Sequence, residues 1–204
     1  MAWLGLGATL LVGIGEFLVH FSSLGYAGAE NFLWLANIPG DRITIGHFLM
    51  IAGMPLYIFG YFYLYQCLRM AHINVARSIL VFGIVAFMVG SVWAGSRALL
   101  TEIVKADNHL LIDYYKTHYE VLVTFLRVLI FMISALWAYV ILSKPTGFPK
   151  WLAFVNPIVL LGVLFLLYFT LPTIGSLLVP SAMNVTHFIF FSLCLIMYRK
   201  PEPK

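Results

Sequence analysis

The sequence predicts an all-α integral membrane protein: a bundle of six transmembrane helices, formed as a single domain by residues 1–204, with both termini in the cytoplasm. Composition is the first observation behind this prediction. Of the residues, 62% are hydrophobic and only 10% are charged, whereas about 25% are charged in a soluble domain. The second is a series of long apolar runs, each near the ~20 residues that a helix needs to cross a bilayer. The third is an uneven distribution of Lys and Arg among the connections.

The apolar runs define the predicted helices. Only helices and closed barrels satisfy the backbone in lipid, and these runs are too long and continuous for barrel strands. The first run lacks a basic start and contains Glu16 and His20, so we interpret it as a retained helix and not as a cleaved signal. Pro55, Pro157 and Pro172 are expected to kink or end helices. The predicted segments are 3–24, 43–68, 76–98, 118–142, 151–171 and 176–198.

The connections carry further local predictions. Residues 31–36 are expected to form a short interfacial helix. Within 99–117, the third and fourth helices are expected to extend beyond the membrane and to reverse at Asp107–Asn108, because Asp and Asn favour turns. Residues 144–149 contain two prolines and a glycine, which predicts a tight turn.

The orientation follows from basic residues, which gather in cytoplasmic loops. The connection 25–42 has only Arg42, and 99–117 offsets its lysines with three acidic residues. The net charge of +4 is explained by the cytoplasmic bias, so no nucleic-acid partner is predicted. The compact chain and short loops fit a multi-pass protein of a cell membrane, specifically a bacterial inner membrane. The basic residues assigned to the cytoplasm are Arg69, Arg77, Lys144, Lys150, Arg199, Lys200 and Lys204.

Ionisable and polar side chains within the apolar segments gather at one predicted depth, in the outer half of the bundle. Charge in hydrocarbon is costly and usually faces a partner or a water-filled cavity. We therefore predict the functional site in this layer. Its members are Glu16, His20, His47, Arg97, His118, Glu120, Asn184 and His187.

A catalytic set is predicted within this layer. Glu16 and His20 are four residues apart and share one helix face, which suits a general acid or base with a proton relay through His20 and His47. Arg97 would hold an anionic or developing oxyanion group, and Glu120 is the second candidate carboxylate. The alternative for Glu16 is structural: a carboxylate neutralised by an arginine of another helix.

Two arginines have competing interpretations. Arg97 lies four residues after Trp93, and the pair could bind an anionic head group or form an ordinary interfacial anchor. Arg127 continues a stripe from Glu120 and lies near mid-membrane, where insertion costs about 2.5–3.5 kcal/mol. Structural pairing of Arg127 with Glu16 or Glu120 is favoured. The alternative is a role as counterion to an anionic ligand or as a member of a proton pathway.

Three histidines raise the question of a cofactor. His20, His47 and His187 are predicted at similar depth on three helices, and with Glu16 or Glu120 they would suit zinc or iron. Two of them could instead bind haem. No His-x-x-x-His spacing supports a metal, and a lone histidine is more often a hydrogen-bonded core residue, so the cofactor is left unknown.

Aromatic and polar side chains near the layer predict a substrate wall. Tyr57 and Tyr61 are one turn apart on the second segment and could line a pocket for a lipid or isoprenoid, or could simply pack in the core. The predicted substrate-binding residues are Tyr57, Tyr61, Trp93, Arg127, Asn184 and His187.

The sequence thus predicts a small membrane enzyme that performs acid–base chemistry on a lipid or isoprenoid-like substrate, as an isomerase, cyclase or hydrolase. Three alternatives stay open: a metal- or haem-binding protein, a proton-coupled transporter or ligand sensor, and a structural subunit of a complex. The enzyme is favoured because the predicted inner half is almost purely apolar, whereas a transport path needs polar residues at both ends. The predicted partner is a lipid or another amphiphilic small molecule, and the prediction is compatible with an oligomer.

Overall fold

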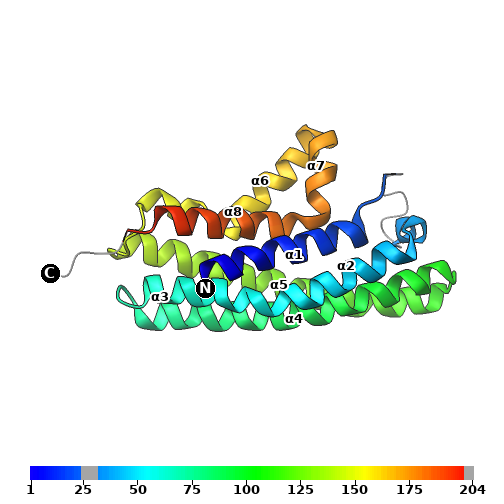
Figure 1. Ribbon diagram of the computed structural model, residues 1–204, viewed down its shortest axis with the longest axis horizontal. Coiled ribbons are helices and arrows are strands. Elements are labelled where there is room, and N and C mark those ends of the chain that lie inside the picture. The colour runs from blue at the N-terminus through cyan, green and yellow to red at the C-terminus, as the bar shows by residue number, and fades with distance from the viewer. Residues whose placement is uncertain (24–31, 200–204) are drawn as a thin grey trace.

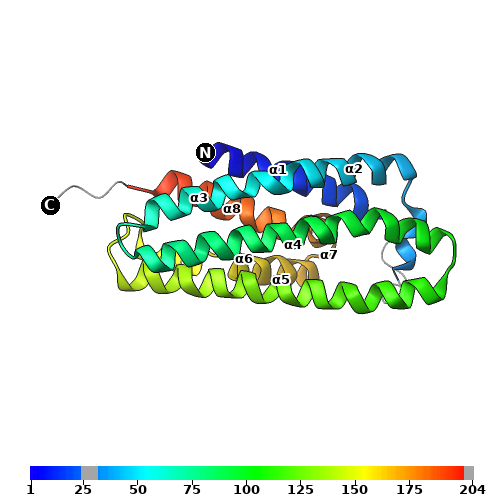
Figure 2. The ribbon, with the colours of Figure 1, turned by 90° about the horizontal axis from the view of Figure 1, so that it is seen from below.

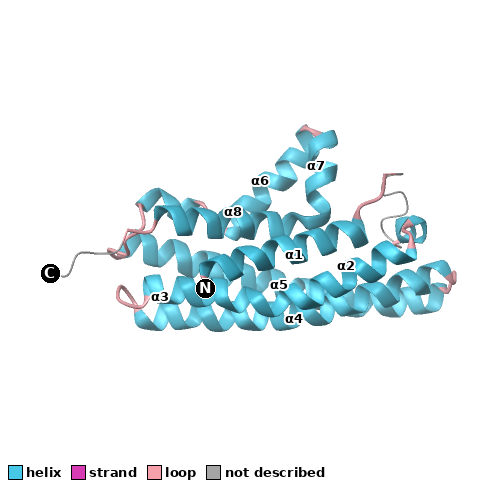
Figure 3. Ribbon diagram, in the orientation of Figure 1, coloured by secondary structure: helices cyan, strands magenta, loops and turns pink. Residues whose placement is uncertain are grey.

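The computed structural model describes residues 1–23 and 32–199. This part of the chain is helical and contains no strand (Figure 3). The long helices run side by side along the longest axis, whereas α6 and α7 form a hairpin that projects from the side of the bundle (Figure 1). The elements are α1 (Ala2–His20), η2 (Leu33–Asn37), α2 (Gly40–Gly53), η3 (Met54–Leu56), α3 (Tyr57–Leu68), α4 (Ile73–Lys105), α5 (His109–Ser143), η4 (Lys150–Phe154), α6 (Pro157–Thr170), α7 (Pro172–Leu178), η5 (Val179–Ser181) and α8 (Ala182–Met197).

Close packing of α1 on α2 sets the position of the residues that follow in α1. A Cβ atom added to Gly15 would lie 2.6 Å from the carbonyl oxygen of Gly46, and the reverse contact is also 2.6 Å. Small residues permit such close approach between apolar helices. The second predicted segment is continuous from Gly40 to Leu68 except for one 3₁₀ turn at Pro55, because proline cannot donate the normal helical hydrogen bond.

The α4–α5 hairpin confirms the predicted helix extension and turn. α4 reaches Lys105 and α5 begins at His109, and the two helices lie alongside each other in Figure 2. Asp107 has φ 52°, and the Asn108 side chain accepts a hydrogen bond from the Leu111 amide at 3.1 Å. Asp and Asn tolerate this left-handed conformation and cap helix starts. Among the described residues of the predicted 31–36 helix, the structure forms η2, which packs against α4.

The fifth predicted segment differs from the expectation. η4 occupies its first residues, and α6 contains only 14 residues, which makes it about 21 Å long, short of the ~30 Å hydrocarbon core. Asn156 caps its start and Leu171–Pro172 ends it. Five helical stretches in the described chain are long and apolar enough to cross a membrane, so the predicted six-span bundle is supported for five of its segments. They are Ala2–His20, Gly40–Leu68, Ile73–Lys105, His109–Ser143 and Pro172–Met197.

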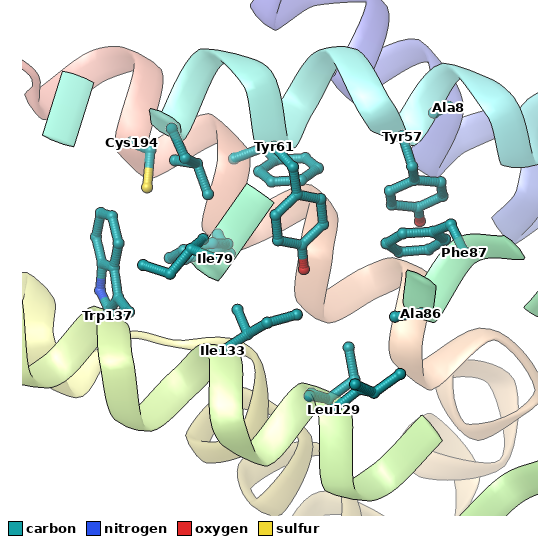
Figure 4. Close-up of a cluster of buried hydrophobic side chains, with 14 of the residues drawn as sticks. Ala8, Tyr57, Tyr61, Ile79, Ala86, Phe87, Leu129, Ile133, Trp137 and Cys194 are labelled. Carbon is teal, nitrogen blue, oxygen red and sulfur yellow. The ribbon is translucent and has the colours of Figure 1, made fainter. Parts of the chain in front are cut away.

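The central core joins α3, α4, α5 and α8. Tyr57, Tyr61 and Trp137 are fully buried, and the Tyr57 ring stacks on Phe87 at a centroid distance of 3.7 Å. A Cβ on Gly83 would lie 2.4 Å from the Tyr61 ring, so glycine lets α4 approach α3 there. Figure 4 shows the tyrosines and Phe87 on one side of this core and the side chains of α5 on the other.

The connection after α5 is held by side chains that satisfy backbone carbonyls. The Lys150 ammonium donates to the carbonyls of Leu142 and Lys144, each at 2.9 Å, and also to that of Ile141. These carbonyls have no helical partner at the end of α5. The Trp137 indole donates to the Leu152 carbonyl at 2.9 Å. These bonds hold η4 against the end of α5.

Candidate functional site

A cavity of about 510 Å³ lies between α1, α4, α5, α6 and the start of α8. Ligand sites usually have about 300–1,000 Å³ and mostly apolar walls with a few polar groups. Here the polar lining consists mainly of Glu16, His20, Arg97, Arg127 and Asn184. The walls include Phe87, Trp93, Leu126, Ile130, Leu161 and Phe165.

Glu16 is held by a chain of hydrogen bonds that crosses three helices. The Asn184 amide nitrogen donates to Glu16 Oε2 at 2.5 Å, and the Tyr57 hydroxyl donates to Asn184 Oδ1. All three side chains are buried. Because the tyrosine hydroxyl donates to the amide oxygen, the amide must present its nitrogen to Glu16. Glu16 Oε1 accepts no hydrogen bond from the described residues, and the Glu16 side chain lines the cavity.

His20 lies one turn beyond Glu16 and also lines the cavity. Its Nδ1 is 3.3 Å from the Pro180 carbonyl oxygen. A carbonyl only accepts, so Nδ1 carries the hydrogen and Nε2 of the neutral ring carries the lone pair. Within the described ranges, Nε2 has no hydrogen-bond partner. The ring packs edge-on against Trp93 at 5.7 Å, which fixes its orientation beside Glu16.

Arg97 is buried, with 4% of its surface exposed. Its guanidinium carbon lies 4.6 Å from the Trp93 ring centroid and 4.7 Å from that of Tyr119, and Nη2 donates to the Tyr119 hydroxyl at 2.6 Å. Stacking on aromatic faces stabilises a desolvated guanidinium. Nε and Nη1 have no hydrogen-bond partner in the part of the chain that the structure describes.

The predicted ion pair of Arg127 with Glu16 or Glu120 is not formed. Arg127 is exposed and lines the cavity, whereas Glu120 is exposed and outside it. Seven residues separate the two along α5, which places them about 10 Å apart along the axis, and Glu16 is held by Asn184. The ion pairs within residues 1–23 and 32–199 are both near the α4–α5 turn: Lys105 with Glu102, and His109 with Asp107.

The three histidines proposed as metal ligands are not brought together. The described residues contain no group of three His, Cys, Asp or Glu side chains that could hold a metal ion. His187 is fully buried, its Nδ1 donates to the Met183 carbonyl at 2.8 Å, and the Tyr61 hydroxyl donates to its Nε2 at 2.9 Å. His47 is half-buried on α2 and, like His187, does not line the cavity. A three-histidine metal site is therefore not supported.

The remaining predicted site residues divide between the cavity and the core. Trp93 lines the cavity, whereas Tyr57 and Tyr61 lie in the core. The sequence interpretation missed the wall that α6 contributes through Leu161 and Phe165. The available signal was the pair of breaks at Asn156–Pro157 and Leu171–Pro172, which shorten this helix.

Residues 1–201 match a family described as "Family of unknown function (DUF6796)", and the chain belongs to that family. No curated protein and no solved structure gives a significant match.

Proposed function

We propose that this protein is a membrane-embedded enzyme that transfers protons on an amphiphilic, lipid-like substrate bound in the cavity. One observation carries the proposal: Glu16 and His20 lie one turn apart in a largely apolar cavity of about 510 Å³, with Glu16 held in place by Asn184. Acid and base groups that are positioned before the substrate arrives are what general acid–base catalysis requires.

The two groups suit an isomerisation. Glu16 Oε1 would remove a proton from one position of the substrate and pass it to Nε2 of the neutral His20 ring. The protonated His20 would then deliver this proton to another position of the substrate, which leaves both groups in their starting states, so no further reactant is required. Asn184 and Tyr57 are positioning residues, because they act on the substrate only through Glu16.

Substrate entry from the lipid is supported by the exposure of two cavity-lining residues on neighbouring helices. Arg127 on α5 and Phe165 on α6 are both exposed although they line the cavity. α6 is also too short to close this side over the full depth of a bilayer. We therefore place the entrance between α5 and α6, where an apolar chain could enter sideways.

The membrane orientation belongs to the same proposal. The α3–α4 turn and the end of α8 lie at one end of the bundle (Figure 1), and both carry basic residues, which favours a cytoplasmic location for this end. The cavity groups Arg97 and His20 would then lie in the outer half. A bacterial inner membrane fits this arrangement.

The proposal is tested by lipid profiling. Wild-type protein and Glu16→Gln are reconstituted in vesicles of bacterial polar lipid extract with added isoprenoids, and the lipids are compared by untargeted mass spectrometry. We expect a lipid species that is converted by the wild type and at least about a hundredfold more slowly by Glu16→Gln, since a positioned general acid or base contributes about 10²–10⁴-fold. The matched control is Glu120→Gln, which removes an exposed carboxylate outside the cavity. Identical lipid profiles for the wild type and Glu16→Gln would contradict the proposed enzymatic activity. The cavity would then be a binding site for an amphiphile without catalysis.

A further inference from the structure

We propose that the molecule in this cavity carries an anionic head group, a carboxylate or a phosphate on an apolar chain, and that Arg127 binds this group. The inference rests on the proposed function for the presence of an amphiphile in the cavity. It adds the chemical class of that amphiphile and the residue that recognises it.

The depth of Arg127 is the first support. Tyr119 on α5 is hydrogen-bonded to Arg97 on α4, so these two residues lie at a similar depth in the bundle. The ring of His20 on α1 contacts Trp93 on α4, so these two also lie at a similar depth. Arg127 lies eight residues along α5 from Tyr119, which is about 12 Å farther from the α4–α5 turn.

Glu16 lies at a similar depth. Trp93 lies four residues deeper than Arg97 in α4, and Glu16 lies four residues deeper than His20 in α1. Because His20 contacts Trp93, the two steps add up, and Glu16 lies about 12 Å deeper than Arg97. α1 and α4 run in the same direction and α5 in the opposite one (Figure 1). Glu16 and Arg127 therefore line the cavity at one level on different helices, and they form no ion pair within 4 Å.

The charge of the lining is the second support. Among the described residues, two guanidinium groups line the cavity, Arg97 and Arg127, but only one carboxylate, Glu16. Arginine stays protonated in proteins, so the lining has an excess of positive charge even when Glu16 is ionised. An arginine without a counter-charge is costly in the hydrocarbon of a bilayer. An anionic ligand would supply the missing charge.

The shape of the wall supports an amphiphile over a free inorganic anion. Leu126 and Ile130 on α5 and Leu161 and Phe165 on α6 form apolar walls beside Arg127. A guanidinium binds carboxylate and phosphate groups through two parallel hydrogen bonds. A head group at Arg127 with its chain along these walls would satisfy both parts of the site and would present the neighbouring atoms to Glu16.

The test measures binding, not turnover. Protein in phosphatidylcholine nanodiscs is titrated with brominated stearate and with its uncharged methyl ester, and separately with a brominated lysophosphatidate and the matching neutral monoacylglycerol. Bromine quenches tryptophan fluorescence at contact, and Trp93 lines the cavity. The part of the quenching that is lost in Trp93→Phe therefore reports occupancy of the cavity by the probe. We expect at least one anionic probe to bind about tenfold or more tightly than its neutral partner, the effect of a charge-assisted hydrogen bond. Whichever of stearate and lysophosphatidate binds more tightly identifies the preferred head group as a carboxylate or a phosphate.

Arginine variants locate the head group. Arg127→Gln is expected to remove the preference for the anionic probe, and Arg127→Lys to retain part of it. Arg77→Gln is the matched control, because Arg77 is exposed on α4 outside the cavity. Equal binding of charged and neutral probes to the wild type would overturn the inference, and so would an undiminished preference for the anionic probe in folded Arg127→Gln. In either case, Trp93-dependent quenching would still support binding of an amphiphile in the cavity. Absence of Trp93-dependent quenching by every probe would overturn the proposed function itself.

Discussion

Replacing Gly46 by alanine tests whether the close contact of α1 and α2 sets the position of Glu16. The new Cβ would lie 2.6 Å from the carbonyl oxygen of Gly15 and 2.7 Å from Val19 Cγ2. Carbon–oxygen contacts normally begin near 3.3 Å, so the overlap with the backbone oxygen is about 0.7 Å. A backbone atom cannot rotate away, and α1 would have to move off α2 and take Glu16 with it.

The expected loss of stability is about 1–3 kcal/mol, the usual cost of overpacking a well-packed interior. For a chain of this size, that corresponds to a decrease in Tm of about 2–12 °C. The measurement is thermal unfolding in a mild detergent, followed by circular dichroism. Displacement of Glu16 should also reduce any lipid conversion found for the wild type, because Asn184 could no longer hold the carboxylate at its present position.

Gly7 supplies the control for this experiment. It lies in the same helix α1, and an added Cβ would meet nothing within 4 Å. Gly7→Ala is therefore expected to change the stability by less than about 0.5 kcal/mol. If Gly46→Ala unfolded at the same temperature as Gly7→Ala, the two helices would not be packed as closely as the structure indicates, and the argument would fail.

Two further predictions concern hydrogen bonds away from the cavity. Tyr61→Phe removes the hydroxyl that donates to buried His187 and should destabilise the protein by about 0.5–2 kcal/mol, measured as a lower Tm. Tyr65→Phe is the control on the same helix, and an equal effect of the two would contradict this role. Lys150→Met removes the ammonium that caps the end of α5, so amide hydrogen exchange in its last turn should accelerate severalfold. Lys144→Met, at an exposed position, should leave exchange unchanged, and slow exchange in Lys150→Met would show that the cap is unimportant.

The helices could be predicted where local chemistry decides them. The apolar runs located the five helical stretches of the described chain that are long and apolar enough to cross a bilayer. Asp107–Asn108 marked the α4–α5 turn because these residues favour turns. α6 could not be predicted in the same way. Its residues are as apolar as those of a spanning helix, and the predicted segment included Trp151, which the structure places in η4. The start of α6 has a local signal in Asn156–Pro157. The η4 turn before it is held by Lys150 and Trp137, whose hydrogen bonds form only after the chain has folded.

The sequence by itself determined that acid and base groups lie within apolar helices, and that Glu16 and His20 share a face, because both conclusions depend only on composition and helical period. Tertiary structure alone decided which groups meet. Asn184 reaches Glu16 from 168 residues away, His187 bonds to Tyr61 in the core, and Arg127 stands apart from both carboxylates proposed as its partners. Such contacts depend on the rotation and separation of packed helices, which glycines such as Gly15 and Gly46 set through close approach. No periodicity within a single helix contains that information.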